Sequence, residues 1–261
     1  MHFTIFTRED LNSKKIEKKC YRELSKYDLI KDDINPDFVI CIGGDGTFLR
    51  AVQHYFNRIS QITFIGIKSG SLGYFCAYES NEIEKMVSDL IEGKNKIESY
   101  PLLKGIIYDH DRVVDRIYAI NEIRIENPFK TMICEVLIDD EPLEEFRGNG
   151  ILVSSTLGST AYNKSCGGAV IDTRLDLLEL TEIAPIDNII YRSLKESLVL
   201  SSQRKVTIKA PFKDEVVGYD HKLYKLEERI THVVVSYSKK KIKIVTRNFI
   251  SSLRRSFIIN N

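Results

Sequence analysis

The chain has 261 residues, of which 43% are hydrophobic, and this is enough to build the core of one large domain or of two small ones. Its 38 basic and 37 acidic residues nearly cancel, so no overall charge draws it to nucleic acid or to an anionic membrane, and we predict neither as a partner. The five cysteines are widely spaced, so we predict no disulfides. The first segment lacks the layout of a signal peptide, and no apolar run approaches the ~20 residues of a membrane span. We therefore predict a cytoplasmic protein.

The first hundred residues predict an α/β domain with a parallel sheet. Apolar, β-branched runs alternate with segments whose apolar residues recur at helical spacing. Strands are expected at 3–6, 38–42 and 62–67, and helices at 11–26, 48–56 and 81–92. This alternation is typical of parallel strands connected by helices.

The turn Gly43-Gly44-Asp45-Gly46-Thr47 joins a predicted strand to a predicted helix. Its glycines let a ligand approach the backbone, and the helix start offers unpaired N–H groups to a phosphate. A carboxylate does not help to bind an anion, but Asp45 can accept the proton of a substrate hydroxyl that attacks phosphorus. The alternative is that Asp45 only caps the helix.

After Tyr100-Pro101 the pattern becomes mainly β. The expected strands are 104–108, 113–118, 122–127, 132–138, 150–155, 206–210, 232–237 and 241–246, and the expected helices are about 160–166 and 174–181. Ser238-Lys239-Lys240-Lys241 is interpreted as a solvated hairpin turn, and the basic amphipathic segment 247–261 as a tail that docks on the protein's own surface. We therefore expect an α/β domain over 1–100, a β-rich domain over 101–236 and a final strand and tail over 237–261 that return to the first domain.

Three further stretches carry polar residues that a purely structural interpretation does not need. They are Asn121-Glu122 at a strand start, Arg147-Gly148-Asn149-Gly150, and Gly158-Ser159-Thr160-Ala161-Tyr162-Asn163 followed by Gly167-Gly168. Each has a structural alternative: Asn121 as a turn residue, Asn149 as a left-handed residue, Thr160 as a helix cap and Tyr162 as a core residue. With Asp45 they would form a nucleotide site.

These stretches resemble the bacterial NAD kinases over nearly the full length of the chain. The resemblance rests on the Gly43–Thr47 turn, Leu72-Gly73-Tyr74, Ala119-Ile120-Asn121-Glu122 and, above all, Gly158–Asn163. The first motif is shared with diacylglycerol and sphingosine kinases, so only the last is specific to the family.

The resemblance implies transfer of a phosphoryl group from ATP or a similar donor to the 2′-hydroxyl of the adenosine ribose of NAD, with a divalent cation, Mg²⁺ being expected. It implies that Asp45 is the base, that Gly43, Gly44, Gly46 and Thr47 meet the donor phosphates, and that the chain forms a homodimer or homotetramer. The residues implied in NAD binding are Asp45, Gly46, Tyr74, Asn121, Glu122, Arg147, Asn149, Ser159, Thr160, Ala161, Tyr162, Asn163, Ser165, Ala184 and His221. Metal ligands are not assigned.

The chain departs from the family pattern in three places. Asn149 stands where relatives have an aspartate, Thr156-Leu157 replaces a Pro-Thr, and Asp220-His221-Lys222 replaces a common Asp-Gly-Gln. Asn149 can still hydrogen-bond a hydroxyl but carries no charge, so weaker binding of NAD is one expectation.

Two other functions stay open at this stage. A lipid kinase of the diacylglycerol or sphingosine type needs a membrane-facing surface, for which only the tail is a candidate. A non-catalytic NAD or NADP sensor needs the pocket but not the carboxylate of Asp45.

Overall fold

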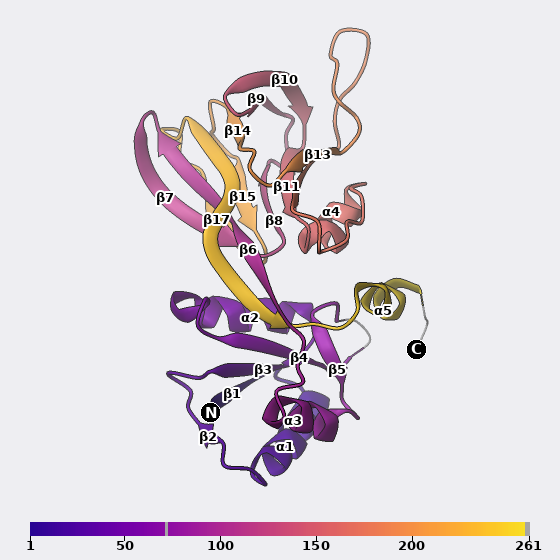
Figure 1. The fold of residues 1–261 in the computed structure, drawn as a ribbon. Helices are drawn as coiled ribbons and strands as arrows, with labels where there is room; N and C mark the ends of the chain where they lie inside the picture. Colours follow the sequence, from indigo (N-terminus) through magenta and orange to yellow (C-terminus); the bar gives the residue numbers. More distant parts are fainter. Residues whose placement is uncertain (71–72, 259–261) are drawn as a thin grey trace. The chain divides into compact units, whose positions relative to one another are not determined.

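The computed structural model describes residues 1–70 and 73–258 and divides the chain into two compact units (Figure 1). Unit 1 comprises Met1–Tyr100 and Lys240–Asn261, and unit 2 comprises Pro101–Lys239. Two long strands, β6 (Ile97–Asp109) and β17 (His232–Val245), begin in one unit and end in the other. The predicted boundary at residue 236 falls inside β17.

Unit 1 is built on a parallel sheet, as predicted. β3 (Phe38–Gly43) pairs in parallel with β1 (His2–Thr7) and with β4 (Thr63–Lys68). The short strands β2 (Ile30–Lys31) and β5 (Cys76–Glu79), which the sequence analysis does not predict, add to β1 and β4. Residues 243–244 of β17 also pair with β4.

Helices cover both faces of this sheet (Figure 1). α1 (Leu11–Leu24) and α3 (Ile83–Ile91) share one apolar cluster with Ile40, Ile42, Ile65 and Ile67 of the strands. α2 (Asp45–His54), followed by the 3-10 turn η1 (Phe56–Arg58), packs on the other face, where the rings of Phe48 and Phe64 lie 5.9 Å apart. Both faces are therefore buried, which explains why β3 is apolar throughout and β4 is apolar between Thr63 and Lys68.

Unit 2 contains a six-stranded sheet in which the strand order is β13-β12-β11-β8-β15-β16. These strands are β8 (Glu122–Glu126), β11 (Gly150–Ser155), β12 (Leu177–Ile183), β13 (Leu198–Ser201), β15 (Val216–Tyr219) and β16 (Lys222–Lys225). All neighbours in this sheet are antiparallel.

The second sheet of unit 2 has the order β10-β9-β14-β17, and β6 pairs with both β17 and β7. Its remaining strands are β7 (Arg112–Ala119), β9 (Met132–Ile138), β10 (Glu141–Gly148) and β14 (Val206–Lys209).

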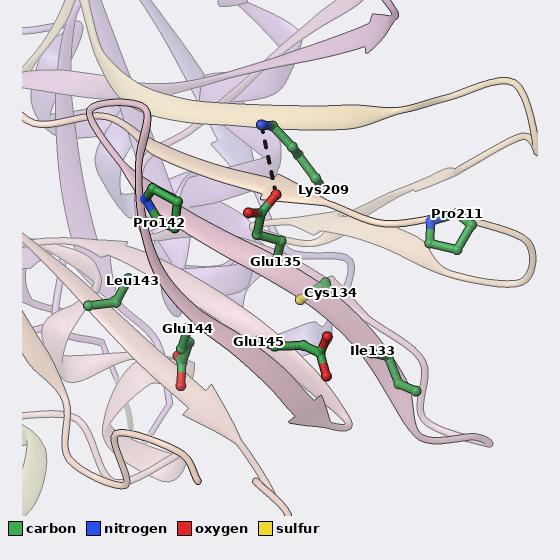
Figure 2. Close-up of a pocket in the computed structure, with 9 residues that line it drawn as sticks. All are labelled: Ile133, Cys134, Glu135, Pro142, Leu143, Glu144, Glu145, Lys209 and Pro211. Carbon is green, nitrogen blue, oxygen red and sulfur yellow. Dashed lines mark ion pairs between the residues drawn. The ribbon is translucent and has the colours of Figure 1, made fainter. Parts of the chain in front are cut away.

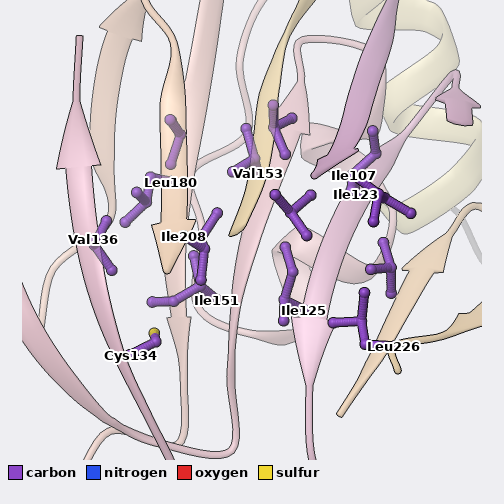
Figure 3. Packing of buried hydrophobic residues seen from close by; sticks show 14 of the residues in the cluster. Ile107, Ile123, Ile125, Cys134, Val136, Ile151, Val153, Leu180, Ile208 and Leu226 are labelled. Carbon is purple, nitrogen blue, oxygen red and sulfur yellow. The ribbon is translucent and has the colours of Figure 1, made fainter. Parts of the chain in front are cut away.

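One apolar core fills the space between the two sheets of unit 2 (Figure 3). The side chains that face it are Ile123, Ile125, Ile151 and Val153 from one sheet and Cys134, Val136 and Ile208 from the other. Because successive side chains of a strand point to opposite faces, the residues between them, such as Glu122 and Arg124, point away from this core.

Two local predictions are wrong. The predicted helix at 174–181 is largely strand β12, because Leu178 and Leu180 are buried in the core and the backbone pairs on both sides with β11 and β13. The predicted hairpin turn at Ser238–Lys241 lies inside β17, which runs unbroken from His232 to Val245. β10, β13, β15 and β16 are also absent from the prediction.

The C-terminal segment docks on unit 1, as predicted for the residues that are described. It forms α5 (Phe249–Leu253) and the π-helical turn η3 (Arg254–Ile258). Arg247 binds the carboxylate of Glu82 and the carbonyl of Ala77, and Arg255 binds Glu79 at 2.8 Å. Residues 259–261 lie outside the described part. Among the described helices none is long and apolar enough to cross a membrane.

Candidate active site

The carboxylate of Asp45 is fixed by two backbone N–H groups of unit 1. Tyr74 N donates to Oδ2 at 3.0 Å and Phe75 N donates to Oδ1 at 2.9 Å. The Phe75 ring stacks on Phe48 with 4.8 Å between the centroids, which holds this turn against α2. The helix-cap alternative is wrong, since the N-cap of α2 is Gly44 and no side chain makes the cap hydrogen bond.

The protonation equilibrium of Asp45 suits a base. Burial raises the pKa of Asp45 from its ordinary value, while the N–H groups of Phe75 and Tyr74 oppose that rise. A raised pKa brings a carboxylate closer to the basicity that proton transfer from a hydroxyl needs. Each carboxylate oxygen keeps a second lone pair beyond the one used by the N–H group.

The predicted donor residues surround the start of α2. Gly44 and Gly46 lie on either side of Asp45, and Gly46 is exposed. Thr47 is buried, packs against Gly43 and accepts a hydrogen bond from the Arg50 guanidinium at 3.3 Å. The side chain of Thr47 therefore packs inside the turn, against Gly43. Leu72 of the second glycine loop lies outside the described residues.

In unit 2, Asn121 and Glu122 lie where the chain enters β8, as predicted. The carbonyl of Asn121 accepts from Ser155 N at 2.8 Å, and Gly158 packs so closely on that carbonyl that any side chain at 158 would overlap it. The Gly158–Tyr162 stretch is thereby held beside the start of β8. The structure brings these two predicted parts of the NAD site together.

Asp220 completes this group from the turn between β15 and β16. Its carboxylate accepts from Ile120 N at 2.9 Å and from Asn121 N at 2.8 Å, and these contacts fix the backbone just before Glu122. His221, also predicted to contact NAD, is exposed in the same turn. Burial raises the pKa of Asp220 to about 6, against the effect of the backbone N–H groups of Ile120, Asn121 and Glu122.

Glu122 is a buried carboxyl group with an unused oxygen. Its side chain is only 4% exposed, and within the described part of the chain Oε2 has no hydrogen-bond partner. Burial and the nearby Asp220 raise the pKa of Glu122 to about 8, while Arg124 opposes this. A buried oxygen without a partner is costly, and a bound hydroxyl would satisfy it.

The ring of Tyr162 is presented to solvent. Tyr162 is 41% exposed at the start of α4 (Tyr162–Ser165), so the alternative that it is a core residue is wrong. Ser165, at the last position of α4, is also exposed. An open aromatic face is a suitable surface on which a base can stack.

The other members of the Gly158–Asn163 stretch turn inward. Ser159 accepts from Ile171 N at 3.1 Å and donates to Thr156 O at 2.8 Å, within the 3-10 turn η2 (Gly158–Thr160). The amide of Asn163 donates to Glu179 at 2.7 Å and accepts from Thr181 at 2.8 Å. These two side chains anchor the stretch. Thr160 does not cap α4, whose N-cap is Ala161, and its hydroxyl donates to Leu157 O at 3.4 Å.

Arg147, Asn149 and Ala184 form a separate group at the opposite end of β11. Asn149 N donates to Ile183 O at 2.9 Å, and Ile186 N donates to Arg147 O at 2.7 Å. Asn149 is not left-handed, whereas Ala184 is, with a φ of 44°. Six residues of β11 separate this group from the Gly158 stretch, a span of about 20 Å.

A cavity of about 420 Å³ lies elsewhere in unit 2 and contains none of the predicted site residues (Figure 2). It is formed by β9, β10 and the end of β14. Lys209 and Glu135 make an ion pair at 3.8 Å across its edge. Glu144 also lines this cavity.

The described residues offer no resident metal site. Among them, no group of three or more His, Cys, Asp or Glu side chains is arranged to hold a metal ion.

The sequence analysis missed three contributors to these groups: the N–H of Phe75, the carboxylate of Asp220 as a support, and Arg124. Only Arg124 had a usable signal. Glu122, Arg124 and Glu126 alternate with Ile123 and Ile125, which places the three charged side chains on one face of β8.

Comparisons with known proteins agree across both units. The model of the ATP-NAD kinase N-terminal domain matches residues 5–95, and that of the ATP-NAD kinase C-terminal domain matches residues 120–246. The chain is 38% identical to the NAD kinase of Lactobacillus gasseri over 92% of both chains. It is 33% identical to the NAD kinase of Pediococcus pentosaceus over 99% of this chain and 98% of that one.

Solved structures show the same fold. An NAD kinase from Archaeoglobus fulgidus in complex with ATP superposes with a TM-score of 0.78 at 22% identity, covering 98% of this chain and 99% of that one. A yeast NADH kinase complexed with NADH gives a TM-score of 0.83 at 18% identity, covering 97% and 85% of the two chains.

Proposed function

The chain belongs to the NAD kinase family and transfers a phosphoryl group from ATP to the 2′-hydroxyl of the adenosine ribose of NAD, and we propose that Asp45 is the base of this reaction. The observation that carries the proposal is the pair of N–H groups that holds the Asp45 carboxylate in one orientation in a buried setting.

In the proposed reaction, the 2′-hydroxyl oxygen attacks the terminal phosphorus of ATP, and the bond from that phosphorus to the bridging oxygen breaks. Asp45 accepts the hydroxyl proton, and the products are NADP and ADP. A fixed carboxylate needs no reorientation as the proton moves, so the barrier includes little rearrangement of the protein. Gly43, Gly44 and Gly46 allow the donor phosphates to approach the start of α2.

We propose that NAD is bound mainly by the group around β8. Asn121 and Glu122 supply an amide and a carboxyl group for ribose hydroxyls, and Tyr162 supplies a stacking surface for adenine. Thr160 and Ala161 shape the same pocket, with Ser165 and His221 at its edges. Tyr74, whose N–H holds Asp45 in unit 1, is a further proposed contact of NAD. Ser159 and Asn163 act by holding the stretch in place, because their side chains already hydrogen-bond to other parts of unit 2.

We propose that the divalent cation, Mg²⁺ or a similar ion, is bound by the phosphates of ATP and comes with it. Magnesium often keeps most of its ligands as water and substrate phosphate. The lack of a suitable cluster among residues 1–70 and 73–258 supports this over a resident ion.

A homodimer or homotetramer is the proposed assembly. Ile189 and Ile190, in the segment between β12 and β13, are 94% and 78% exposed, and adjacent exposed isoleucines are typical of an interface. Arg147, Asn149 and Ala184 border the same segment, so we propose that they complete the NAD site through a second copy. Sedimentation of wild type beside Ile189→Asp tests this: an unchanged mass would contradict it.

A cytoplasmic location is also a proposal, supported by five cysteines that all carry free thiols. The two other functions weighed above are not favoured. The models that match both units are those of NAD kinases, which favours NAD kinase activity over a lipid kinase or a non-catalytic sensor.

The decisive experiment measures NADP formation from NAD, ATP and Mg²⁺ with a coupled NADP-specific dehydrogenase, together with NAD binding by calorimetry. Turnover by the wild type that is lost in Asp45→Asn, with NAD binding retained, is the expected result. Binding without turnover for the wild type would contradict the proposed activity.

A further inference from the structure

Arg124 contacts both of the side chains that we place against the adenosine of NAD, although it has no assigned role. Its guanidinium carbon lies 5.3 Å from the centroid of the Tyr162 ring. Its Nη1 lies 3.6 Å from Oε1 of Glu122, and its Nε donates to Glu126 at 2.8 Å. One planar cation thus connects the aromatic and the acidic part of the proposed pocket.

The opposite strand leaves room for this cation. Gly218 of β15 is the direct partner of Arg124 on β8, and a Cβ at position 218 would overlap the guanidinium. The guanidinium therefore lies directly over Gly218, in space that a side chain at this position would take.

We propose that Arg124 is a positioning residue for NAD, which supports the Tyr162 ring and sets the charge of Glu122. It touches no reacting atom, so its effect is on binding. This inference rests on the proposed roles of Tyr162 and Glu122 in the NAD site.

The charge part of the proposal has a definite sign. The titratable and charged groups that face Glu122 are Arg124 and Glu126 on β8, Asp220 from the β15–β16 turn and Cys166 after α4. Arg124 is the one cation among these four, and it favours ionised Glu122. Its removal must raise the pKa of Glu122, whichever form of the carboxyl group binds NAD.

Two variants separate the contribution of the charge from that of the planar contact. Arg124→Gln removes both the charge and the cation contact with Tyr162, and we expect the KM for NAD to rise roughly tenfold with kcat nearly unchanged. The inflection in the pH profile of kcat/KM should move upward by about one pH unit. Arg124→Lys keeps the charge but not the planar contact, so it should leave the inflection in place and raise KM only about threefold.

Gly218→Ala tests the same inference without changing any charge, because the new methyl group displaces the guanidinium. It should raise the KM for NAD and move the inflection in the same direction as Arg124→Gln. Arg204→Gln is the matched control, since Arg204 pairs with Asp139 on the surface of unit 2 at 2.6 Å, far from β8 in sequence. This control should match the wild type.

NAD binding by calorimetry in the absence of ATP keeps this inference separable from the proposed activity. Equal NAD dissociation constants for wild type, Arg124→Gln and Gly218→Ala would overturn the inference whether or not turnover is seen. If Arg124→Gln fails to fold, Gly218→Ala alone decides: wild-type KM and pH profile would overturn the inference, and a raised KM with a raised inflection would support it.

Discussion

At the scale of single residues, the contacts of Asp45 predict that an asparagine variant loses stability as well as activity. The sequence alone predicts only the loss of activity. Both carboxylate oxygens accept backbone N–H groups, so the NH₂ of an asparagine would face one of these donors. Asp45→Asn should therefore lower kcat by about 10²- to 10⁴-fold and also lower the stability by about 1–3 kcal/mol. Steady-state kinetics and thermal unfolding measure the two effects.

The control for this variant is Asp37→Asn, which also removes a carboxylate that accepts a backbone N–H group, from His2 at 2.7 Å. It should lose some stability but keep its turnover. A kcat for Asp45→Asn within a few-fold of that of Asp37→Asn would show that Asp45 is not the base.

The exposed ring of Tyr162 predicts an effect of its removal on NAD binding. Removing the exposed ring with Tyr162→Ala should raise the KM for NAD by about 5- to 150-fold, because stacking of a base on an aromatic ring contributes about 1–3 kcal/mol. The kcat at saturating NAD should change much less. Tyr162→Phe keeps the ring and should keep the KM, so an equal loss in both variants would assign the effect to the hydroxyl instead.

At the scale of elements, β10 and β12 hold a pair of acidic side chains that should make unit 2 sensitive to pH. Burial and the neighbouring Glu182 raise the pKa of Glu144 to about 7. Both carboxyl groups accept N–H groups from the segment after β12: Leu194 N donates to Glu144 at 3.3 Å and Lys195 N donates to Glu182 at 2.7 Å. The nearby ammonium of Lys195 is paired with Asp187 at 2.6 Å.

The sign of this dependence follows from the raised pKa of Glu144. In the unfolded chain Glu144 loses its proton near the ordinary pKa of about 4.5, whereas in the folded protein it keeps the proton up to about pH 7. The stability that Glu144 contributes is therefore complete below about pH 4.5 and is lost as the pH rises through about 7. Glu144→Gln should be more stable than the wild type at pH 8 and should show a flatter melting temperature between pH 5 and pH 8.

Thermal unfolding of wild type and Glu144→Gln across that range checks the prediction. Glu141→Gln is the control, since Glu141 is exposed at the start of β10, and it should follow the wild-type curve. Parallel curves for the wild type and Glu144→Gln would mean that the titration of Glu144 does not cause the pH dependence.

At the scale of the whole molecule, the parts of the fold that repeat a simple pattern were predictable. Strand β3 and the middle of β4 are apolar, and α3 beside them has one apolar face. β12 was not predictable, since Leu177-Leu178-Glu179-Leu180 fits a helix as well as a strand, and pairing with β11 and β13 decides between them.

The candidate site divides in the same way. Motifs of adjacent residues, such as Gly43–Thr47 and Gly158–Asn163, are visible in the sequence. The contacts of Asp45 with Tyr74 N and Phe75 N join residues about thirty positions apart, and those of Asp220 with Ile120 N and Asn121 N join residues about a hundred apart. Only the folded chain shows which distant N–H groups serve a given carboxylate.

The docked C-terminal segment contacts β5 next to the turn that holds Asp45, so we predict that it supports both the stability of unit 1 and the position of the base. Arg255 donates to Glu79 at 2.8 Å and to Cys76 O at 2.9 Å, and Cys76 directly follows the residue whose N–H holds Asp45. Arg255→Ala should lower stability by about 1–2 kcal/mol, since charged hydrogen bonds that are partly exposed contribute about this much.

The same variant should also lower kcat several-fold with little change in the KM for NAD, because the turn that orients Asp45 loses its support. Arg254→Ala is the matched control: it removes the same charge from the neighbouring, exposed position and should leave both kcat and the melting temperature unchanged. If Arg255→Ala lowers the melting temperature but keeps the wild-type kcat, the segment stabilises unit 1 without positioning the base. If Arg254→Ala is equally impaired, the effect comes from the charge of the tail and not from its contacts with β5.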